Sequence, residues 1–228
     1  MKILLWDIDG TLIRSGNAGL RAMNCAAARV LGVPAAFDNL EFAGRTDPWA
    51  ISTVCGRHGL APAPRQLGEF YAVYVEELRS ELHNPHARVC AGIHALLEHF
   101  HRDPGVVQGL LTGNISAGAR VKLEHFSLWQ YFAFGAFADD SGDRNALAAI
   151  ALERARTHSN GTALSARNLV VIGDTPHDAA CARHIGARSA LTATGRFGTA
   201  ELAACGPDLL VQDFADPQPL LEFVSRLD

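Results

Sequence analysis

Two carboxylates stand one residue apart at the end of a short apolar run near the start of the chain. Residues 2–6 read Lys-Ile-Leu-Leu-Trp, and Asp7 and Asp9 follow, with Gly10 and Thr11 directly behind. A buried parallel strand carries such an uninterrupted run, and alternate residues of a strand share a face. The two acids are therefore expected side by side where open α/β sheets bind ligands. A polar turn after a strand uses the same residue types, so this pair alone does not establish a site.

A second acidic cluster follows another apolar run, residues 169–172, and reads Gly-Asp-Thr-Pro-His-Asp. Thr175 is suited to cap a helix and Pro176 to occupy its first turn, so a helix is expected to begin here. Asp174 would then lie at the tip of a strand and Asp178 in the first helical turn. An acid in that turn also simply favours the helix dipole, and this alternative stays open for Asp178.

A third loop lies between the two acidic clusters. It reads Leu111-Thr112-Gly113-Asn114, follows an apolar run and precedes a helix-like stretch. A hydroxyl and free backbone N–H groups at the start of a helix suit an anion. The loop is therefore a candidate anion-binding site.

The three motifs, in this order, resemble those of the haloacid dehalogenase superfamily, in its phosphoglycolate-phosphatase-like branch with a helical cap between the first and second motifs. The first motif is residues 7–11, the second residues 111–114 and the fourth residues 173–178. Any one such string recurs by chance. Three in the family's order, spanning most of the chain, make a specific signal.

The cation of the family's third motif has two candidates in this sequence. The family usually supplies a lysine, whereas residues 143–147 offer Arg144 at the start of a predicted helix. Lys122 lies eight residues beyond Asn114, about 12 Å along a helix axis, and its side chain is expected to recover only part of that distance. The planar fork of Arg144 could bridge two acids and a phosphate oxygen, so we predict Arg144. Alternatively, Arg144 only pairs with acids on the surface.

The resemblance implies a Mg²⁺-dependent phosphatase that hydrolyses a small phosphomonoester. Asp7 would be the nucleophile that forms an aspartyl-phosphate, and Asp9 the general acid and base. The metal would be bound by the side chains of Asp7 and Asp174 and by the main-chain carbonyl of Asp9. Asp178 would orient the metal's waters or the cationic residue.

Substrate contacts are also implied by the resemblance. The phosphate would be bound by the loops of the first and second motifs, at Gly10, Thr112, Gly113 and Asn114. Residues 44–47 resemble the family's cap loop that faces the catalytic centre, which makes Arg45 and Thr46 candidate substrate contacts. The alternative for these two is a surface arginine and an ordinary helix cap.

The acidic residues of the motifs help to distinguish the activities that the same fold supports. Haloacid dehalogenases lack the second acid of the first motif and need no Mg²⁺, so Asp9 argues against dehalogenation. A sugar-phosphate mutase would use the same four acids and remains an alternative. A non-catalytic binding protein on a retained hydrolase fold is a further one, because fold does not fix function.

The spacing of apolar residues predicts an α/β fold with an inserted helical segment. Residues 15–85 are expected to form a helical cap, with helices over residues 17–31, from Thr46 to residues 56–59, and over residues 65–82. Outside it, the expected strands cover residues 106–112, 131–137, 168–173, 188–192 and 208–211, and the expected helices cover residues 92–101, 115–126, 145–157, 176–185 and 217–227. This alternation predicts a Rossmann-like parallel sheet with helices on both faces, formed by residues 1–14 and 86–228.

Composition excludes several classes of partner. With 228 residues, a formal net charge of −4 and dispersed basic residues, the chain has no electrostatic footprint for a nucleic-acid polymer. The apolar run before Asp7 is too short for a signal peptide, and no stretch is expected to span a membrane. Five widely spaced cysteines without a Cys-x-x-Cys indicate a reduced, cytoplasmic protein. The expected partner is a small phosphorylated metabolite; which one, and the oligomeric state, the sequence leaves open.

Overall fold

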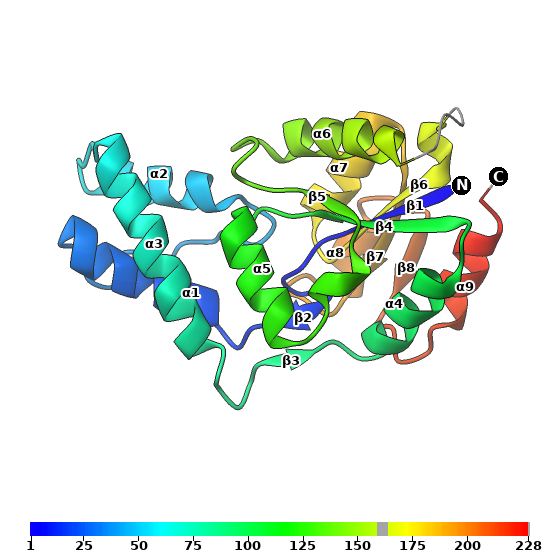
Figure 1. Cartoon of the computed structure of the whole chain (residues 1–228), viewed down its shortest axis with the longest axis horizontal. Helices are drawn as coiled ribbons and strands as arrows, with labels where there is room; N and C mark the ends of the chain where they lie inside the picture. The colour runs from blue at the N-terminus through cyan, green and yellow to red at the C-terminus, as the bar shows by residue number, and fades with distance from the viewer. Residues whose placement is uncertain (159–163, 228) are drawn as a thin grey trace.

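A six-stranded parallel sheet forms the centre of the protein. The computed structural model describes residues 1–158 and 164–227, and Figure 1 shows the sheet with helices above and below it. In spatial order the strands are β5 (Phe134–Ala136), β4 (Val106–Leu111), β1 (Lys2–Trp6), β6 (Leu169–Gly173), β7 (Arg188–Thr192) and β8 (Leu209–Val211). Strand β1 lies between β4 and β6. The three strands that precede the predicted motifs are therefore neighbours, and their carboxyl ends meet at one edge.

Helices cover both faces of the sheet because the side chains of each buried strand alternate between two cores. Leu4 and Trp6 pack with helices α4 (Ile93–Arg102), α5 (Ser116–His125) and α9 (Gln218–Ser225). Ile3 and Leu5 point the other way, against α6 (Arg144–Thr157) and α7 (Pro176–Ile185). The short helix α8 (Thr199–Ala203) covers β7 through Leu202. The predicted doubly covered parallel sheet is confirmed.

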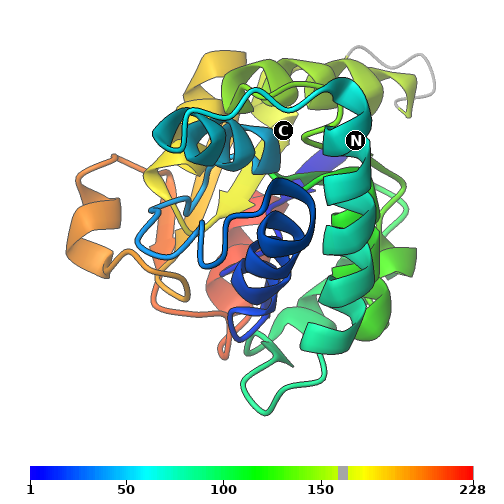
Figure 2. The same ribbon diagram turned by 90° about the vertical axis from the view of Figure 1, so that its left-hand side faces the viewer.

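A separate group of helices stands over the carboxyl edge of the sheet. It comprises α1 (Ala18–Ala26), the π-helical turn η1 (Ala27–Leu31), α2 (Asp47–Arg57) and α3 (Pro64–Glu81). Figure 2 shows α1 and α3 side by side in front of the sheet, and they share an apolar core that includes Met23, Phe70 and Tyr74. The helix predicted over residues 17–31 changes from α to π after Ala26 and ends at Gly32, whose φ is +73°.

Several short elements were not predicted. Strands β2 (Ile13–Arg14) and β3 (Arg88–Val89) form an antiparallel pair where the chain leaves the sheet for the helical group and returns from it. The strand expected from residue 131 begins at Phe134, because a 3₁₀ turn, η2 (Trp129–Tyr131), precedes it. A second 3₁₀ turn, η3 (Ala166–Asn168), leads into β6, and α8 was also missed. Elements of two to five residues are too short to show a hydrophobic period.

No helix in the described ranges, 1–158 and 164–227, has the length and apolarity needed to cross a membrane.

Candidate active site

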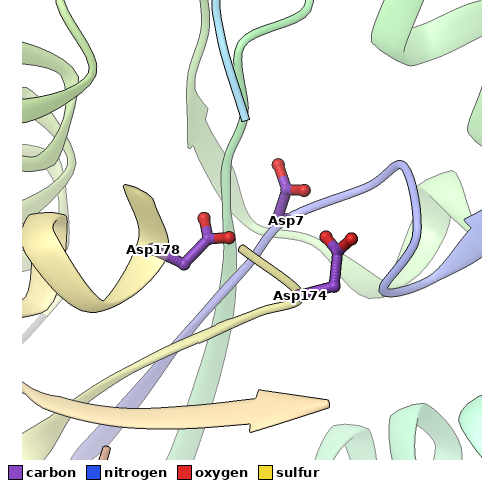
Figure 3. Close-up of side chains that lie close together, drawn as sticks. All are labelled: Asp7, Asp174 and Asp178. Atoms are coloured by element: carbon purple, nitrogen blue, oxygen red, sulfur yellow. The ribbon is translucent and has the colours of Figure 1, made fainter. Parts of the chain in front are cut away.

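Three of the predicted acids meet at the carboxyl edge of the sheet. Asp7 directly follows β1, Asp174 follows β6, and Asp178 lies in the first turn of α7. Figure 3 shows their side chains gathered at one point, and each offers a carboxylate oxygen within 4.8 Å of the others. The backbone N–H of Asp7 donates to the carbonyl of Ile172 at 2.9 Å, which continues the β1–β6 ladder into the loop. All three acids are buried.

Asp178 caps the first turn of its helix and also contacts the acid cluster. Its carboxylate accepts hydrogen bonds from the backbone N–H of Thr175 at 3.0 Å and from the Thr175 hydroxyl at 2.8 Å. The Thr175 hydroxyl in turn accepts the backbone N–H of His177, so the first turn of α7 is capped reciprocally. Asp178 therefore caps its helix and still presents its second oxygen to the acid cluster.

Arg144 lies inside the acid cluster and not on the surface. It begins α6, whose N-terminus is capped by the Asp143 carboxylate through the N–H of Asn145 at 2.7 Å. One guanidinium nitrogen of Arg144 lies 3.3 Å from Asp7 Oδ1, and another binds Asp178 Oδ1. Arg144 is only 8% exposed, so the alternative of a solvent-exposed surface pair is wrong. The guanidinium bridges the two acids on either side of it, as its planar fork permits.

Lys122 also reaches the site, which contradicts the expectation that its side chain falls short. Its Nζ lies 2.5 Å from Asp9 Oδ2 and 3.0 Å from Asn114 Oδ1. The expected distance of about 12 Å assumes that the helix already begins at Asn114. In the structure α5 begins only at Ser116, so Lys122 is on its second turn. From there a long side chain directed toward the helix start reaches the preceding loop. The site thus holds two buried cations, Arg144 beside Asp7 and Lys122 beside Asp9.

The acid cluster is short of positive charge. Burial raises the pKa of Asp7 to about 7, and the charges of Asp178 and Asp9 add to this effect, while Arg144 opposes it. Burial and the neighbouring carboxylates raise the pKa of Asp174 well above its usual range. The hydroxyl of Thr11 donates to Asp174 at 3.3 Å, but no basic side chain of the described residues pairs with this acid.

This donor set fits a hard divalent cation. Mg²⁺ takes carboxylate and carbonyl oxygens, and a bound dication would offset the negative charge of Asp7 and Asp174, whose pKa values are raised by burial and by their neighbouring carboxylates. Gly10 leaves the room that such a site needs, because a Cβ at this residue, whose φ is +87°, would lie 2.3 Å from Asp174 Oδ2. The residues present therefore fit the predicted metal.

The predicted phosphate loop lies beside the acids. Thr112 follows β4, is buried, and its hydroxyl accepts the backbone N–H of Asn114 at 3.2 Å. The loop lines a cavity of about 640 Å³ that also exposes Asp7, Asp9 and the helical group. The predicted residues Gly10, Thr112, Gly113 and Asn114 are thus brought to the same cavity as the acids.

The loop before α2 touches the phosphate loop directly. Thr46 caps α2 by accepting the N–H of Trp49 at 3.3 Å, as one alternative predicted, and its hydroxyl donates to the carbonyl of Gly142 at 2.8 Å. Arg45 is exposed on the cavity wall, with its guanidinium 4.8 Å from the centre of the Trp49 ring. Arg45 therefore lines the cavity, whereas Thr46 is buried, is not part of the cavity lining and serves as the helix cap of the alternative prediction.

Asp47 is a buried acid that sequence reasoning missed as a site residue. Its backbone N–H donates to the carbonyl of Gly113 at 2.7 Å, and its carboxylate accepts the N–H of Ile115 at 2.8 Å. Burial raises the pKa of Asp47 to about 6, while the charge of Lys122 lowers it. In the sequence Asp47 is an acid in the first turn of a helix, a common residue there, and nothing local indicates its contact with the phosphate loop.

The family model described as haloacid dehalogenase-like hydrolase matches residues 4–183 of the chain. The chain belongs to this family. The matched range contains all three predicted motifs, so the resemblance seen in the sequence is confirmed.

A curated relative and a solved structure similar to this haloacid dehalogenase-like hydrolase carry phosphatase names. A protein named probable phosphatase IndB, from Dickeya dadantii (strain 3937), is 25% identical over 239 residues, covering 94% of this chain and 90% of that protein. Among solved structures, a predicted phosphoglycolate phosphatase from Haemophilus somnus 129PT matches with a TM-score of 0.73 and 18% identity, over 97% of this chain and 98% of that one. CbbY from Rhodobacter sphaeroides, solved with phosphate, matches with a TM-score of 0.74 and 19% identity, over 95% of this chain and 96% of that one.

The structural likenesses confirm the predicted fold. The family match and the relative named a phosphatase confirm the predicted enzyme class, a phosphoric monoester hydrolase.

Proposed function

We propose that this hydrolase is a Mg²⁺-dependent phosphatase that cleaves a small phosphomonoester through an aspartyl-phosphate on Asp7. One observation carries the proposal: the buried Asp7 carboxylate lies at a strand end against Arg144 and within 4.8 Å of Asp174 and Asp178. A carboxylate attacks phosphorus well only when positive charge surrounds the transferring group. The cluster supplies the nucleophile, one fixed cation and the oxygens for a metal.

Asp7 and Asp9 divide the chemistry between them. In the first step a carboxylate oxygen of Asp7 bonds to phosphorus as the ester P–O bond breaks, and Asp9 gives its proton to the leaving oxygen. In the second step water attacks the same phosphorus, Asp9 takes the proton of that water, and the Asp7–phosphorus bond breaks. The side chain of Asp9 is 40% exposed and lines the cavity, so it can reach both the leaving group and a water.

The remaining residues position the ester. Arg144 holds the Asp7 carboxylate from one side and offers its guanidinium to the phosphate oxygens. The Thr112 hydroxyl and the N–H group of Gly113 would hold the same oxygens, while Lys122 fixes Asp9. The N–H groups of Gly10 and Asn114 are donated to the Ile13 carbonyl and the Thr112 hydroxyl, so these two residues would shape the loops around the phosphate. The helical segment, residues 15–85, would act as a cap, with Arg45 facing the substrate.

The metal would be bound by Asp7, Asp174 and the main-chain carbonyl of Asp9. Bound Mg²⁺ supplies the positive charge that lets an anionic nucleophile approach an anionic ester. Asp178 is engaged by Arg144 and Thr175, so we assign it to orienting the cation and waters, not to direct ligation.

A phosphate-release screen tests the proposal. Wild-type protein is assayed on a panel of phosphomonoesters with Mg²⁺ and with excess chelator, and product mixtures are analysed for isomerised esters. We expect release with Mg²⁺, none with chelator, and a strong loss in Asp174→Ala, while the exposed control Glu69→Gln is unchanged. Isomerised ester without net release would favour the mutase alternative, and full activity in chelator would contradict the metal requirement.

A further inference from the structure

Two arginines face each other where the helical segment joins the sheet. Strands β2 and β3 pair so that Arg14 is directly opposite Arg88. Directly opposite residues of an antiparallel pair project from the same face, with Cβ atoms about 5 Å apart. Figure 1 shows this short pair between the helices α1 and α3 and the sheet, and both arginines line the cavity that contains Asp7.

No acidic side chain of the described residues neutralises the positive charges of this arginine pair. Arg14 donates through Nε to the carbonyl of Thr194 at 2.8 Å, and Arg88 donates to the carbonyl of His86 at 3.3 Å. Throughout residues 1–158 and 164–227, no carboxylate lies within salt-bridge distance of either guanidinium. Of the other arginines of the cavity wall, Arg144 and Arg196 have such partners, in the acid cluster and in Glu41, whereas Arg45 stacks on Trp49. Like charges directly opposite each other destabilise a strand pair.

The pair is also fixed relative to the catalytic loops. The Thr194 hydroxyl donates to the carbonyl of Gly10 at 2.5 Å, and the Thr194 carbonyl holds Arg14. Arg14 is therefore connected through one residue to the loop of the first motif. The acids that line the cavity are Asp7, Asp9, Asp47 and Asp174, and neither arginine forms an ion pair with any of them. The cavity thus has a second basic wall apart from the catalytic cations.

We propose that Arg14 and Arg88 bind a second anionic group of the substrate, a carboxylate or a phosphate at the end opposite the scissile ester. This inference rests on the proposed phosphatase function and specifies its substrate class. Two planar guanidinium groups on one face can bind a carboxylate or a phosphate through charge-assisted hydrogen bonds. A bound anion would also relieve the repulsion between the two arginines.

Matched substrate pairs test the proposal. The pairs are 3-phosphoglycerate with glycerol 3-phosphate, ribulose 1,5-bisphosphate with ribulose 5-phosphate, and fructose 1,6-bisphosphate with fructose 6-phosphate. In each pair one member ends in a carboxylate or a second phosphate and the other in a hydroxyl. We expect wild-type kcat/KM to favour the doubly anionic member of at least one pair by about tenfold or more, since that is the range of charged hydrogen bonds.

The variants separate the arginine pair from other basic residues. Arg14→Gln and Arg88→Gln are expected to reduce that preference about tenfold, mainly by raising KM for the doubly anionic member. Arg65→Gln, an exposed arginine of the helical segment, should leave the preference unchanged. Melting temperatures check folding, and Arg88→Gln is the safer variant because Arg88 does not hold the Thr194 loop. The first pair reports a carboxylate and the other two a phosphate.

A binding measurement distinguishes failure of this proposal from failure of the phosphatase assignment. Calorimetric titration of Asp7→Asn with the same six compounds should give tighter binding of the preferred doubly anionic member, and Arg88→Gln added to this protein should remove the difference. If nothing is hydrolysed but the Arg88-dependent difference in Kd persists, the phosphatase assignment fails and the anion site stands. If no pair shows a preference, or the preference survives in both arginine variants, the anion site is wrong.

Discussion

At the scale of single residues, burial changes the pKa of Asp47 and, through it, the stability of the protein. It begins a helix, yet its carboxylate accepts the N–H of Ile115, directly beyond the phosphate loop. Its folded-state pKa of about 6 lies above its ordinary value of 3.8. Because the folded protein holds this proton more tightly than the unfolded chain, ionising Asp47 costs stability as pH rises from about 4 to 6.

Asp47→Asn should therefore gain stability relative to wild type as pH rises. An amide keeps an oxygen for the Ile115 N–H but has no charge to bury. Denaturant unfolding at pH 4, 5 and 7 should show the variant improving against wild type by up to about 3 kcal/mol, the equivalent of the pKa shift. The exposed acid variant Glu69→Gln should show no such trend. If Asp47→Asn instead lost stability relative to wild type between pH 4 and 7, the raised pKa of the buried Asp47 carboxyl would be contradicted.

At the scale of elements, the contact between the helical segment and the sheet depends on a glycine of the phosphate loop. A Cβ at Gly113 would lie 2.1 Å from the carbonyl oxygen of Arg45 and 3.1 Å from Thr46 Cα. The two loops are in close backbone contact, with the Asp47 N–H bound to the Gly113 carbonyl. A side chain at this position must push the loops apart.

Gly113→Ala is expected to lower kcat/KM about 100-fold, because displacements near 1 Å have effects of that size. The accompanying loss of stability should be about 1–3 kcal/mol, as for other overpacked sites. Phosphate release and unfolding are measured together. Gly56→Ala is the matched control, since this glycine lies within α2 with open space around its Cβ, and it should be neutral or stabilising. Wild-type activity in Gly113→Ala would show that the loop contact is dispensable.

The long elements with a clear hydrophobic period could be predicted from the sequence. The features that were missed depend on contacts between segments that are distant in the sequence. The apolar runs before Asp7 and Asp174 identify buried strands, and shared strand ends then bring their acids together. No local pattern indicates that the two-residue strands β2 and β3 pair, so the facing of Arg14 and Arg88 was not predictable. The expectation that Lys122 falls short of the site was wrong, because the reach of this side chain depends on where α5 begins.

At the scale of the whole molecule, the fold buries three acids close together. Their repulsion lowers the free energy of unfolding, and a bound cation would reduce this loss. Asp7, Asp174 and Asp178 come from two strand ends and a helix start, and burial raises the pKa of the first two. The repulsion within this cluster opposes folding. A metal that binds only the folded protein should therefore increase its stability.

Mg²⁺ should raise the melting temperature of the wild-type protein over that in chelator. At one hundred times its Kd, a ligand stabilises by about 2.7 kcal/mol, which corresponds to roughly 5–10 °C for a chain of this size. Asp174→Ala should lose most of this increase, while Glu69→Gln should keep it. Equal increases in wild type and Asp174→Ala would place the bound metal elsewhere.

The central claim is that Asp7 accepts the phosphoryl group, and trapping that group tests it most directly. In Asp9→Asn, p-nitrophenyl phosphate with Mg²⁺ should still phosphorylate Asp7, because its leaving group needs no proton, whereas the second step lacks its base. After an acid quench, mass spectrometry should find one phosphoryl group on the peptide that carries Asp7. Asp7→Asn in the same background should show none. A phosphoryl group on another residue, or hydrolysis in Asp7→Asn at the wild-type rate, would contradict the account.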